Sequence, residues 1–164
     1  KDFFLLEQND WEGFSDEKAL YYDQETVIYD QVANQQIPAA EMITRDYTGN
    51  KGSWYAYIYA DGDRIIGMTL KQNLDSLLRQ RVTLGIIESV ADDANLGWTL
   101  TVREAKDWSS YREQWMPKSA AIRVGIADAL LLKNDKVIQP EELRVGDRLY
   151  IVRDDFTGKV IIVK

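Results

Sequence analysis

The sequence contains no cysteine and no histidine. Without cysteine, the chain has no disulfide, no thiolate nucleophile and no cysteine metal site. Without histidine, it lacks the side chain that most often transfers protons near pH 7 and the commonest ligand of transition metals. These two absences exclude many enzyme mechanisms, and we expect no catalytic residue, no cofactor and no metal site.

The formal net charge of −7 has the wrong sign for binding nucleic acid. Non-specific affinity for a phosphate backbone comes from lysine and arginine, which release counterions, so an acidic chain is repelled. An anionic membrane surface disfavours an acidic chain for the same reason. No apolar run approaches the roughly 20 residues that a membrane-spanning helix needs. We therefore expect neither nucleic acid as a partner nor membrane insertion.

The chain has 164 residues, 45% of them hydrophobic, which is enough for one ordinary domain or two small ones with a core each. It begins at Lys1 rather than with methionine, and a strand-like Phe3-Phe4-Leu5-Leu6 follows almost at once. This beginning predicts that the chain was excised from a longer protein or processed.

The clearest local pattern lies at the C-terminal end. Two runs of β-branched, aliphatic and aromatic residues, 149–152 and 160–163, flank a polar segment that contains Asp154, Asp155 and Gly158. This pattern is typical of a β-hairpin with a loop of about four or five residues. Gly146-Asp147 supplies a turn before the first strand, because glycine readily adopts a positive φ.

Three blocks of sequence recur in the same order along the chain. The first contains Glu, then Asp-Trp, then an aromatic residue three positions beyond the Trp, the second contains a glutamate near a proline, and the third is the hairpin with its final lysine. The matched blocks are 5–14 with 102–111, 37–42 with 138–143, and 57–71 with 150–164. This recurrence predicts an internal duplication. The spacing changes from 97 to 101 to 93 residues, which places the length differences in surface loops.

The second unit reads as a small β-barrel. We expect strands at 81–90, 98–104 and 122–132, the last broken or bent near Gly125, followed by a short capped segment at 140–143 and the closing hairpin. Trp108, Tyr111 and Trp115 stand at i, i+3 and i+7, which predicts a short helix over 107–116 that Pro117 ends. Five strands with such an insert are typical of a Greek-key barrel of the OB type.

The first unit begins where the second strand of the second unit begins, so its own first strand is missing. We expect a first, N-terminally incomplete barrel over 1–71, a connecting helix over 72–80 and a second barrel over 81–164. A barrel that lacks a strand exposes unpaired backbone groups. This predicts a further strand before Lys1, or cover from a neighbouring chain or from the other barrel.

The hairpin region carries a resemblance. Leu-Arg-Val-Gly-Asp-Arg-Leu-Tyr-Ile-Val at 143–152, followed by Lys-Val-Ile-Ile-Val at 159–163, resembles the closing hairpin of small bacterial extracytoplasmic OB-like β-barrel domains. The resemblance covers about the last half of each unit, and the first unit lacks the Gly-Asp turn. It implies tandem barrels on secreted or surface-anchored proteins, without catalytic residues. Since a Val-Gly-Asp turn before a strand also occurs in SH3-like barrels, a pair of SH3-like barrels is the alternative fold.

A row of tyrosines provides the first candidate site. Alternation along 54–60 places Tyr55, Tyr57 and Tyr59 on one face of a strand. Such a row could be a stacking platform for sugars or bases. The favoured interpretation is that the row packs against the second barrel or the connecting helix, because tyrosine is common at interfaces. Trp115 has no counterpart in the first unit and is a candidate for an exposed contact. These four residues are the candidate binding residues.

A second group of aromatic residues recurs at matched places in the two units. Trp11 and Trp108, with Phe14 and Tyr111, could line a cleft, but recurrence within a duplicated unit favours plugs that close the barrel ends.

Two weaker patterns concern metals and catalysis. Acidic clusters at 61–63, 92–95 and 154–155 offer oxygen ligands for calcium, but they lack the spacing of a known calcium loop, and Asp beside Gly is ordinary turn chemistry. Ser119 beside Lys118 is a lone adjacency and not a dyad. No phosphate-binding loop and no nucleophile elbow occur.

Together these patterns predict a non-catalytic spacer or interaction module of a larger bacterial surface or secreted protein. Its partners would be other domains of the same protein, or a surface protein or polysaccharide. The alternative is a polysaccharide- or peptide-binding module that uses an aromatic barrel face. A hydrolase that uses two carboxylates is a third class, and it would need a deep cleft between them.

Overall fold

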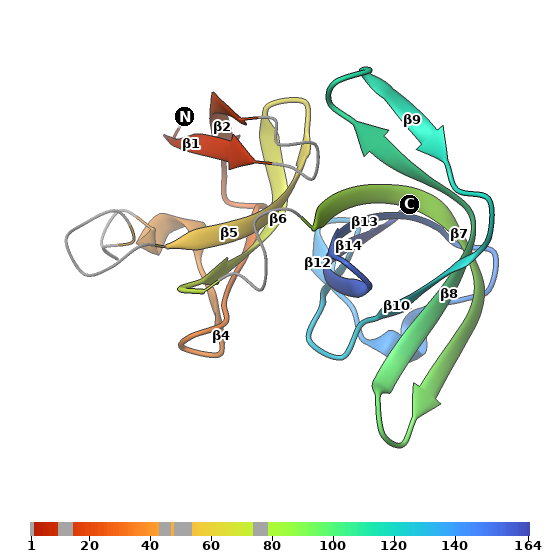
Figure 1. Ribbon diagram of the computed structural model, residues 1–164. Helices are drawn as coiled ribbons and strands as arrows, with labels where there is room; N and C mark the ends of the chain where they lie inside the picture. The colour runs from red at the N-terminus through yellow and green to blue at the C-terminus, as the bar shows by residue number, and fades with distance from the viewer. Residues whose placement is uncertain (1, 10–14, 43–46, 48–53, 74–78) are drawn as a thin grey trace.

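The computed structural model describes residues 2–9, 15–42, 47, 54–73 and 79–164, with the backbone alone for 2–9, 15 and 16. These residues form two β-sheets that lie side by side (Figure 1) and two single-turn 3-10 helices, η1 (Ala39–Glu41) and η2 (Pro140–Glu142). The predicted all-β fold with a few short helices is confirmed. No helix in the described ranges is long and apolar enough to cross a membrane.

The first sheet contains the six strands of the N-terminal half of the chain. Hydrogen bonds connect them in the order β1-β2-β6-β3-β4, and β5 pairs with β6 as well. β1 and β2 form an antiparallel hairpin, whereas β2 and β3 both run parallel to β6. The strands are β1 (Asp2–Asn9), β2 (Ser15–Tyr22), β3 (Val27–Asp30), β4 (Gln35–Ile37), β5 (Tyr55–Asp61) and β6 (Arg64–Lys71).

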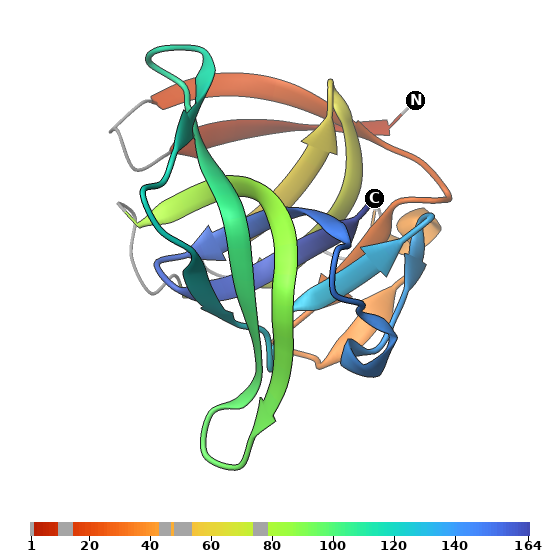
Figure 2. The same ribbon diagram turned by 90° about the vertical axis from the view of Figure 1, so that its right-hand side faces the viewer.

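The second sheet contains the eight remaining strands, and five of them close into a ring. Hydrogen bonds connect β8 to β7, β7 to β13, β13 to β14, β14 to β10 and β10 back to β8. Figure 2 shows the long β7–β8 hairpin, in green, extending beyond the rest of the sheet. The strands are β7 (Gln80–Asp93), β8 (Gly97–Ser109), β9 (Gln114–Pro117), β10 (Ile122–Gly125), β11 (Leu130–Lys133), β12 (Lys136–Val137), β13 (Arg148–Asp154) and β14 (Thr157–Val163).

The predicted C-terminal hairpin is present as β13 and β14, and its strands reach further than the apolar runs. β13 continues to Asp154 and β14 starts at Thr157, so only two residues connect them, not the four or five expected. Asp155 takes a positive φ of 52° in this tight turn, which aspartate tolerates better than most residues. A β-bulge between Val152 and Arg153 absorbs the change of register.

The turn before β13 forms as expected around Gly146, whose φ is +92°. The N–H of Gly146 donates to the carbonyl of Ile87 at 2.9 Å, and the carboxylate of Asp147 accepts the N–H of Arg144 at 3.0 Å. The strand expected over 122–132 is broken near Gly125, because β10 ends at Gly125 and β11 begins at Leu130. There the chain leaves β8, and the N–H of Gly125 donates to the carbonyl of Phe156 at 2.8 Å.

The predicted helix over 107–116 is wrong. The chain instead makes a hairpin, in which β9 folds back along the end of β8 and Trp108 lies opposite Trp115. A positive φ of 52° at Glu113 and a hydrogen bond from the N–H of Arg112 to Ser109 Oγ shape the turn. Around such a turn, positions seven apart face each other across a strand pair, so aromatic spacing that suits a helix also suits a hairpin.

The predicted connecting helix over 72–80 falls largely on residues 74–78, which lie outside the described residues. Residues 72, 73 and 79 are not helical, and Gln80 already belongs to β7.

Three groups of buried hydrophobic residues support the sheets. One fills the second sheet, where Ile87, Leu100, Val102 and Ile151 are completely buried. A smaller one supports the first sheet around Ile28, Ile65 and Met68, and Trp54, Ala56 and Ile58 are only partly buried against it. The third contains residues of both sheets: Val27, Tyr57, Leu130, Leu132, Val152, Val160 and Ile162.

Candidate functional site

The third hydrophobic group is the joint between the sheets, and we call it the inter-sheet seam. It brings β3 and β5 of the first sheet against β11, β13 and β14 of the second. Gly67 of β6 shows how closely they approach, because a Cβ atom there would lie 2.4 Å from Leu132 Cδ1. Real Cβ contacts are never that short, so glycine is what allows β6 to pack on β11.

Tyr57 lies in the centre of the seam and is 3% exposed. Its hydroxyl donates a hydrogen bond of 2.8 Å to Asp154 Oδ2 across the seam. The ammonium of Lys159 lies 5.4 Å from the centroid of the Tyr57 ring. Asp154 and Lys159 are themselves buried, so this polar contact lies inside a joint made mainly of hydrophobic side chains. A buried carboxylate needs such a donor, because an unsatisfied one is costly.

A chain of aromatic rings runs from the seam onto the β8–β9 hairpin, and we call it the aromatic strip. Its members, Tyr59, Tyr150, Trp115 and Trp108, are all half-buried. Neighbouring ring centroids lie 5.4 Å apart for Tyr59 and Tyr150, 6.0 Å for Tyr150 and Trp115, and 5.3 Å for Trp115 and Trp108. Lys164 Nζ lies 5.0 Å from the Tyr150 ring. The strip therefore presents aromatic surface next to a cation.

Burial raises the pKa of Tyr59 to about 12, and the nearby Tyr150 and Asp61 contribute to the increase. Tyr59 therefore keeps its proton throughout the physiological pH range, and its hydroxyl remains a donor.

The four candidate binding residues do not form one exposed row. Tyr55 is 38% exposed, Tyr57 is buried in the seam, and Tyr59 is half-buried against Tyr150. Trp115 is half-buried between Tyr150 and Trp108 rather than freely exposed. The structure therefore brings Tyr59 and Trp115 together in the aromatic strip and separates them from Tyr55.

A buried ionic network lies within the second sheet. Arg153, which is 2% exposed, donates from Nη2 to Asp107 Oδ1 at 3.0 Å and from Nε to the hydroxyl of Thr83 at 2.8 Å. Thr83 in turn donates to Asp107 at 2.6 Å, and Lys118 Nζ lies 3.3 Å from Asp107 Oδ2. The network joins β7, β8 and β13, three neighbouring strands of the ring.

The pKa of Asp107 is lowered in this network. Burial alone would raise it, but the hydrogen bond from Thr83 and the charges of Arg153 and Lys118 outweigh burial and favour the carboxylate. Asp107 is therefore ionised at neutral pH and holds the guanidinium of Arg153 in place.

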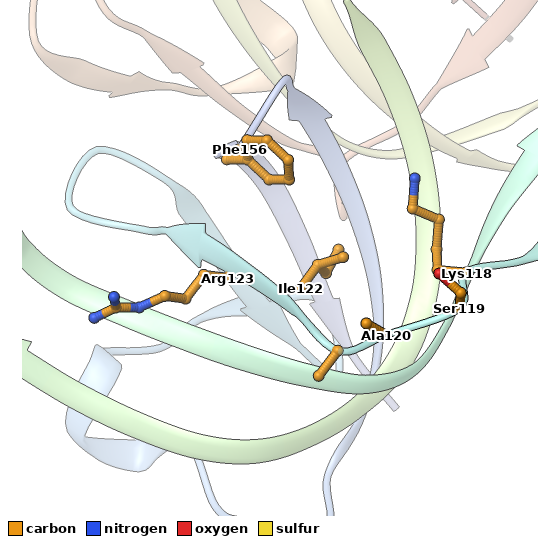
Figure 3. A pocket seen from close by; sticks show the side chains of 7 residues that line it. Lys118, Ser119, Ala120, Ile122, Arg123 and Phe156 are labelled. Carbon is orange, nitrogen blue, oxygen red and sulfur yellow. The ribbon is translucent and has the colours of Figure 1, made fainter.

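A shallow hollow of about 490 Å³ lies where the chain enters β10, next to the turn between β13 and β14. Figure 3 shows Phe156 and Lys118 on either side of Ile122, with Arg123 pointing away from them. Its lining is apolar and cationic: Lys118, Ser119, Ala120, Ala121, Ile122, Arg123 and Phe156. Lys118 and Ser119 both line the hollow, and the lysine makes its ion pair with Asp107.

The aromatic residues predicted to close the barrel ends lie in different places. Trp11 and Phe14 lie outside the described residues. Trp108 packs on Trp115 at the surface hairpin and is not part of the second core, and Tyr111 is 83% exposed in the turn. The plug interpretation is therefore wrong for Trp108 and Tyr111, because the β8–β9 hairpin carries both of them away from the barrel interior.

The acidic clusters take part in turns and in the seam. Gly62, between two aspartates, has a φ of +64° in the β5–β6 turn. Asp93 accepts the N–H groups of Asn95 and Leu96, which lowers its pKa. Among the side chains that the structure describes, no three of the His, Cys, Asp and Glu type gather as metal ligands would.

The sequence analysis did not predict the buried polar residues of the seam and of the ionic network. Arg153 and Asp154 follow an apolar run, and Lys159 precedes another, so all three looked like loop residues of the hairpin. The pattern that could have identified Arg153 and Asp154 is the alternation of side chains along the strand. This alternation continues through 153 and 154 and places their charged side chains in the interior or at an interface.

No protein-family model matches this chain, and the search of curated proteins returned no match.

Proposed function

We propose that the chain is a non-catalytic spacer or interaction module, built from two related OB-like barrels and carried by a larger bacterial surface or secreted protein. The extracytoplasmic setting rests on the resemblance of the 143–163 segment. The non-catalytic role rests on the lack of histidine and cysteine. The remaining support comes from strand pairing and from the seam.

Matching strand pairs support the duplication. Tyr57 pairs with Thr69 in the first sheet and Tyr150 with Ile162 in the second, and both partners are shifted by 93 positions. The β-bulge after Tyr59 recurs after Val152, again 93 positions later. The positive φ of Gly62 recurs at Asp155 with the same shift. The parallel pairs β3–β6 and β11–β14 also correspond, with β6 and β14 shifted by 93 positions and β3 and β11 by 103.

The ring of the second sheet supports the OB assignment. An OB barrel is a five-stranded Greek key. The ring β7-β8-β10-β14-β13 has five members, and β10 and β14 close it by a parallel pair, with η2 between β11 and β13. An SH3-like arrangement is the weaker alternative.

The observation that carries the spacer role is the seam. Tyr57 and Tyr59 contact the second sheet, and Gly67 lets the two sheets pack at van der Waals distance. A joint with a buried hydrogen bond and close packing resists bending more than a flexible linker does. Two barrels joined in this way hold their ends at a fixed separation, which is what a spacer requires.

The lack of cysteine allows a direct test. Val32→Cys in the β3–β4 turn of the first sheet and Val145→Cys in the turn before β13 of the second sheet place one spin label on each side of the seam, at positions that are 56% and 69% exposed. We expect a single narrow distance distribution by pulsed electron paramagnetic resonance. Tyr57→Ala in the same background should broaden it, whereas Tyr55→Ala on the same strand should not. A broad distribution in the parent protein would contradict the spacer role.

A second candidate function is carbohydrate or peptide binding on the aromatic strip. The observation that favours it is the continuous run of half-buried rings beside Lys164. Tyrosine and tryptophan rings stack on apolar faces of ligands and offer polar edges.

Tryptophan fluorescence during titration with a soluble cello-oligosaccharide tests this candidate. Binding that disappears in Trp115→Ala and persists in Tyr111→Ala would support it, since Tyr111 lies outside the strip. An unchanged signal in the parent protein with this sugar and with a soluble chito-oligosaccharide would remove the carbohydrate candidate.

A further inference from the structure

The first sheet has an open place where the second has β7. In the second sheet, β7 pairs with β13 along 148–154 on one side and with β8 along 97–107 on the other. In the first sheet, β5 pairs with β6 and β1 pairs with β2, and no strand of the described ranges bridges β5 and β1. Two strand edges therefore end the sheet where the ring of the second sheet continues.

The edge of β5 is the counterpart of the edge of β13 that binds β7. β5 and β13 each have seven residues, shifted by 93 positions, with the same bulge and the same antiparallel partner strand. A strand can form backbone hydrogen bonds along both of its edges. β5 pairs with β6 along one edge, and its other edge corresponds to the edge of β13 that forms seven residue pairs with β7.

Burial also differs at matched positions. Leu149 and Ile151 of β13 are 1% and 0% exposed, and β7 lies beside them. Their counterparts on β5, Ala56 and Ile58, are only half-buried against the core of the first sheet. The first core is thus incompletely covered on the side where the strand is missing, and an added strand would remove this apolar surface from water.

β7 indicates what the added strand must be. It is an extended segment in which Thr83 and Ile87 are completely buried, and Gly85 stands opposite Leu149. A Cβ at Gly85 would lie 2.3 Å from Val102 Cγ1, so a small residue is needed where the strand crosses its neighbour. The occupant is therefore a strand of alternating apolar and small residues with a glycine near its centre.

A second copy of the chain is a poor donor of such a strand. All of its described strands are already paired in sheets, and to donate one it would have to break those pairs. An extended segment that is unpaired before binding loses no sheet hydrogen bonds, and strand addition to an exposed edge is a common mode of peptide recognition.

We infer that the edges of β5 and β1 receive an extended strand from a polypeptide segment outside residues 1–164, which runs antiparallel to β5 and completes the first barrel. This inference deepens the proposed interaction role and rests on it. The added segment has the residue pattern of β7 and covers Ala56 and Ile58.

A peptide with the β7 sequence, residues 80–93, is the probe. We expect it to bind the 164-residue chain saturably and to slow hydrogen exchange at the β5 amides that point away from β6. At nine-tenths occupancy the slowing is about tenfold, because only the free fraction exchanges. The control peptide carries Leu84→Pro and Ile87→Pro, which remove N–H groups from both sides of the strand, and it should not protect β5.

Three results would overturn the inference. In the first, the peptide does not bind, or it binds to saturation and leaves the hydrogen exchange of the β5 amides unchanged. In the second, the amides of β7 lose protection, which means that the peptide has replaced β7 instead. In the third, sedimentation without peptide detects a dimer in which β5 is protected, so that a second copy is the occupant. None of these results alters the spin-label distance across the seam, so failure of this inference and failure of the spacer role are distinguishable.

Discussion

Replacing Tyr57 with phenylalanine removes one oxygen atom from the seam and leaves the ring in place. The lost atom is the donor of the 2.8 Å hydrogen bond to Asp154, which is 4% exposed. The contact between the Lys159 ammonium and the ring remains. The substitution therefore removes the hydrogen bond to Asp154 across the seam and keeps the aromatic ring in place.

The expected cost follows from the acceptor. A hydrogen bond to a charged group contributes about 1.5–3 kcal/mol, and a buried acceptor that loses its donor has a desolvation penalty of similar size. We expect Tyr57→Phe to lower the free energy of unfolding by about 2 kcal/mol. Tyr55→Phe, on the same strand but 38% exposed, should change it by less than about 0.5 kcal/mol.

Urea unfolding followed by tryptophan fluorescence measures both variants. The midpoint should fall in Tyr57→Phe while the m-value stays constant, because the surface exposed on unfolding is unchanged. A double-mutant cycle with Asp154→Asn should give a coupling energy of about 1 kcal/mol or more. The reasoning is refuted if Tyr57→Phe and Tyr55→Phe lose equal stability or if the cycle shows no coupling.

Three further predictions concern packing, charge and backbone strain. Gly67→Ala should cost about 1–3 kcal/mol by overpacking the seam, whereas Gly125→Ala, whose Cβ would meet only a backbone oxygen at 3.9 Å, should cost less in the same urea assay. Because the folded pKa of Asp107 is depressed, its contribution to stability is present above the unfolded pKa near 3.8 and is lost as the pH falls through the folded value. Asp107→Asn should therefore lower the free energy of unfolding at pH 7, and the variant should lose less of it than the parent protein when the pH is lowered. Glu113→Gly should raise the melting temperature, since Glu113 has a φ of 52° that glycine adopts without strain.

The sequence predicts the fold best where a local pattern is compatible with only one secondary structure. The β-branched runs of 149–152 and 160–163 and the Gly146 turn formed a hairpin as expected, because alternation, propensity and turn chemistry agree there. The aromatic spacing of Trp108 and Trp115 is compatible with two secondary structures. It suits one helical face or one cross-strand pair, and the positive φ that Glu113 accepts could not be seen in the sequence.

The candidate site was harder to predict, because contacts between sheets depend on how two finished units pack. The sequence placed Tyr55, Tyr57 and Tyr59 on one strand face, but not which of them the second sheet covers. Tyr57 is buried and Tyr55 is exposed, since the second sheet covers only part of β5. The ionic pair of Asp107 and Arg153 joins residues 46 positions apart, a contact that no local pattern indicates.

In the proposed duplication, the seam joins corresponding parts of the two units. It contains β3 and β5 from the first sheet and their counterparts β11 and β13 from the second. In the proposed duplication, the two units thus meet largely through corresponding strands. The hydrogen bond of Tyr57 breaks the symmetry, because Asp154 is buried whereas its counterpart, Asp61, is exposed. The polar contact of the joint thus depends on the carboxylate of Asp154, which belongs to the second sheet.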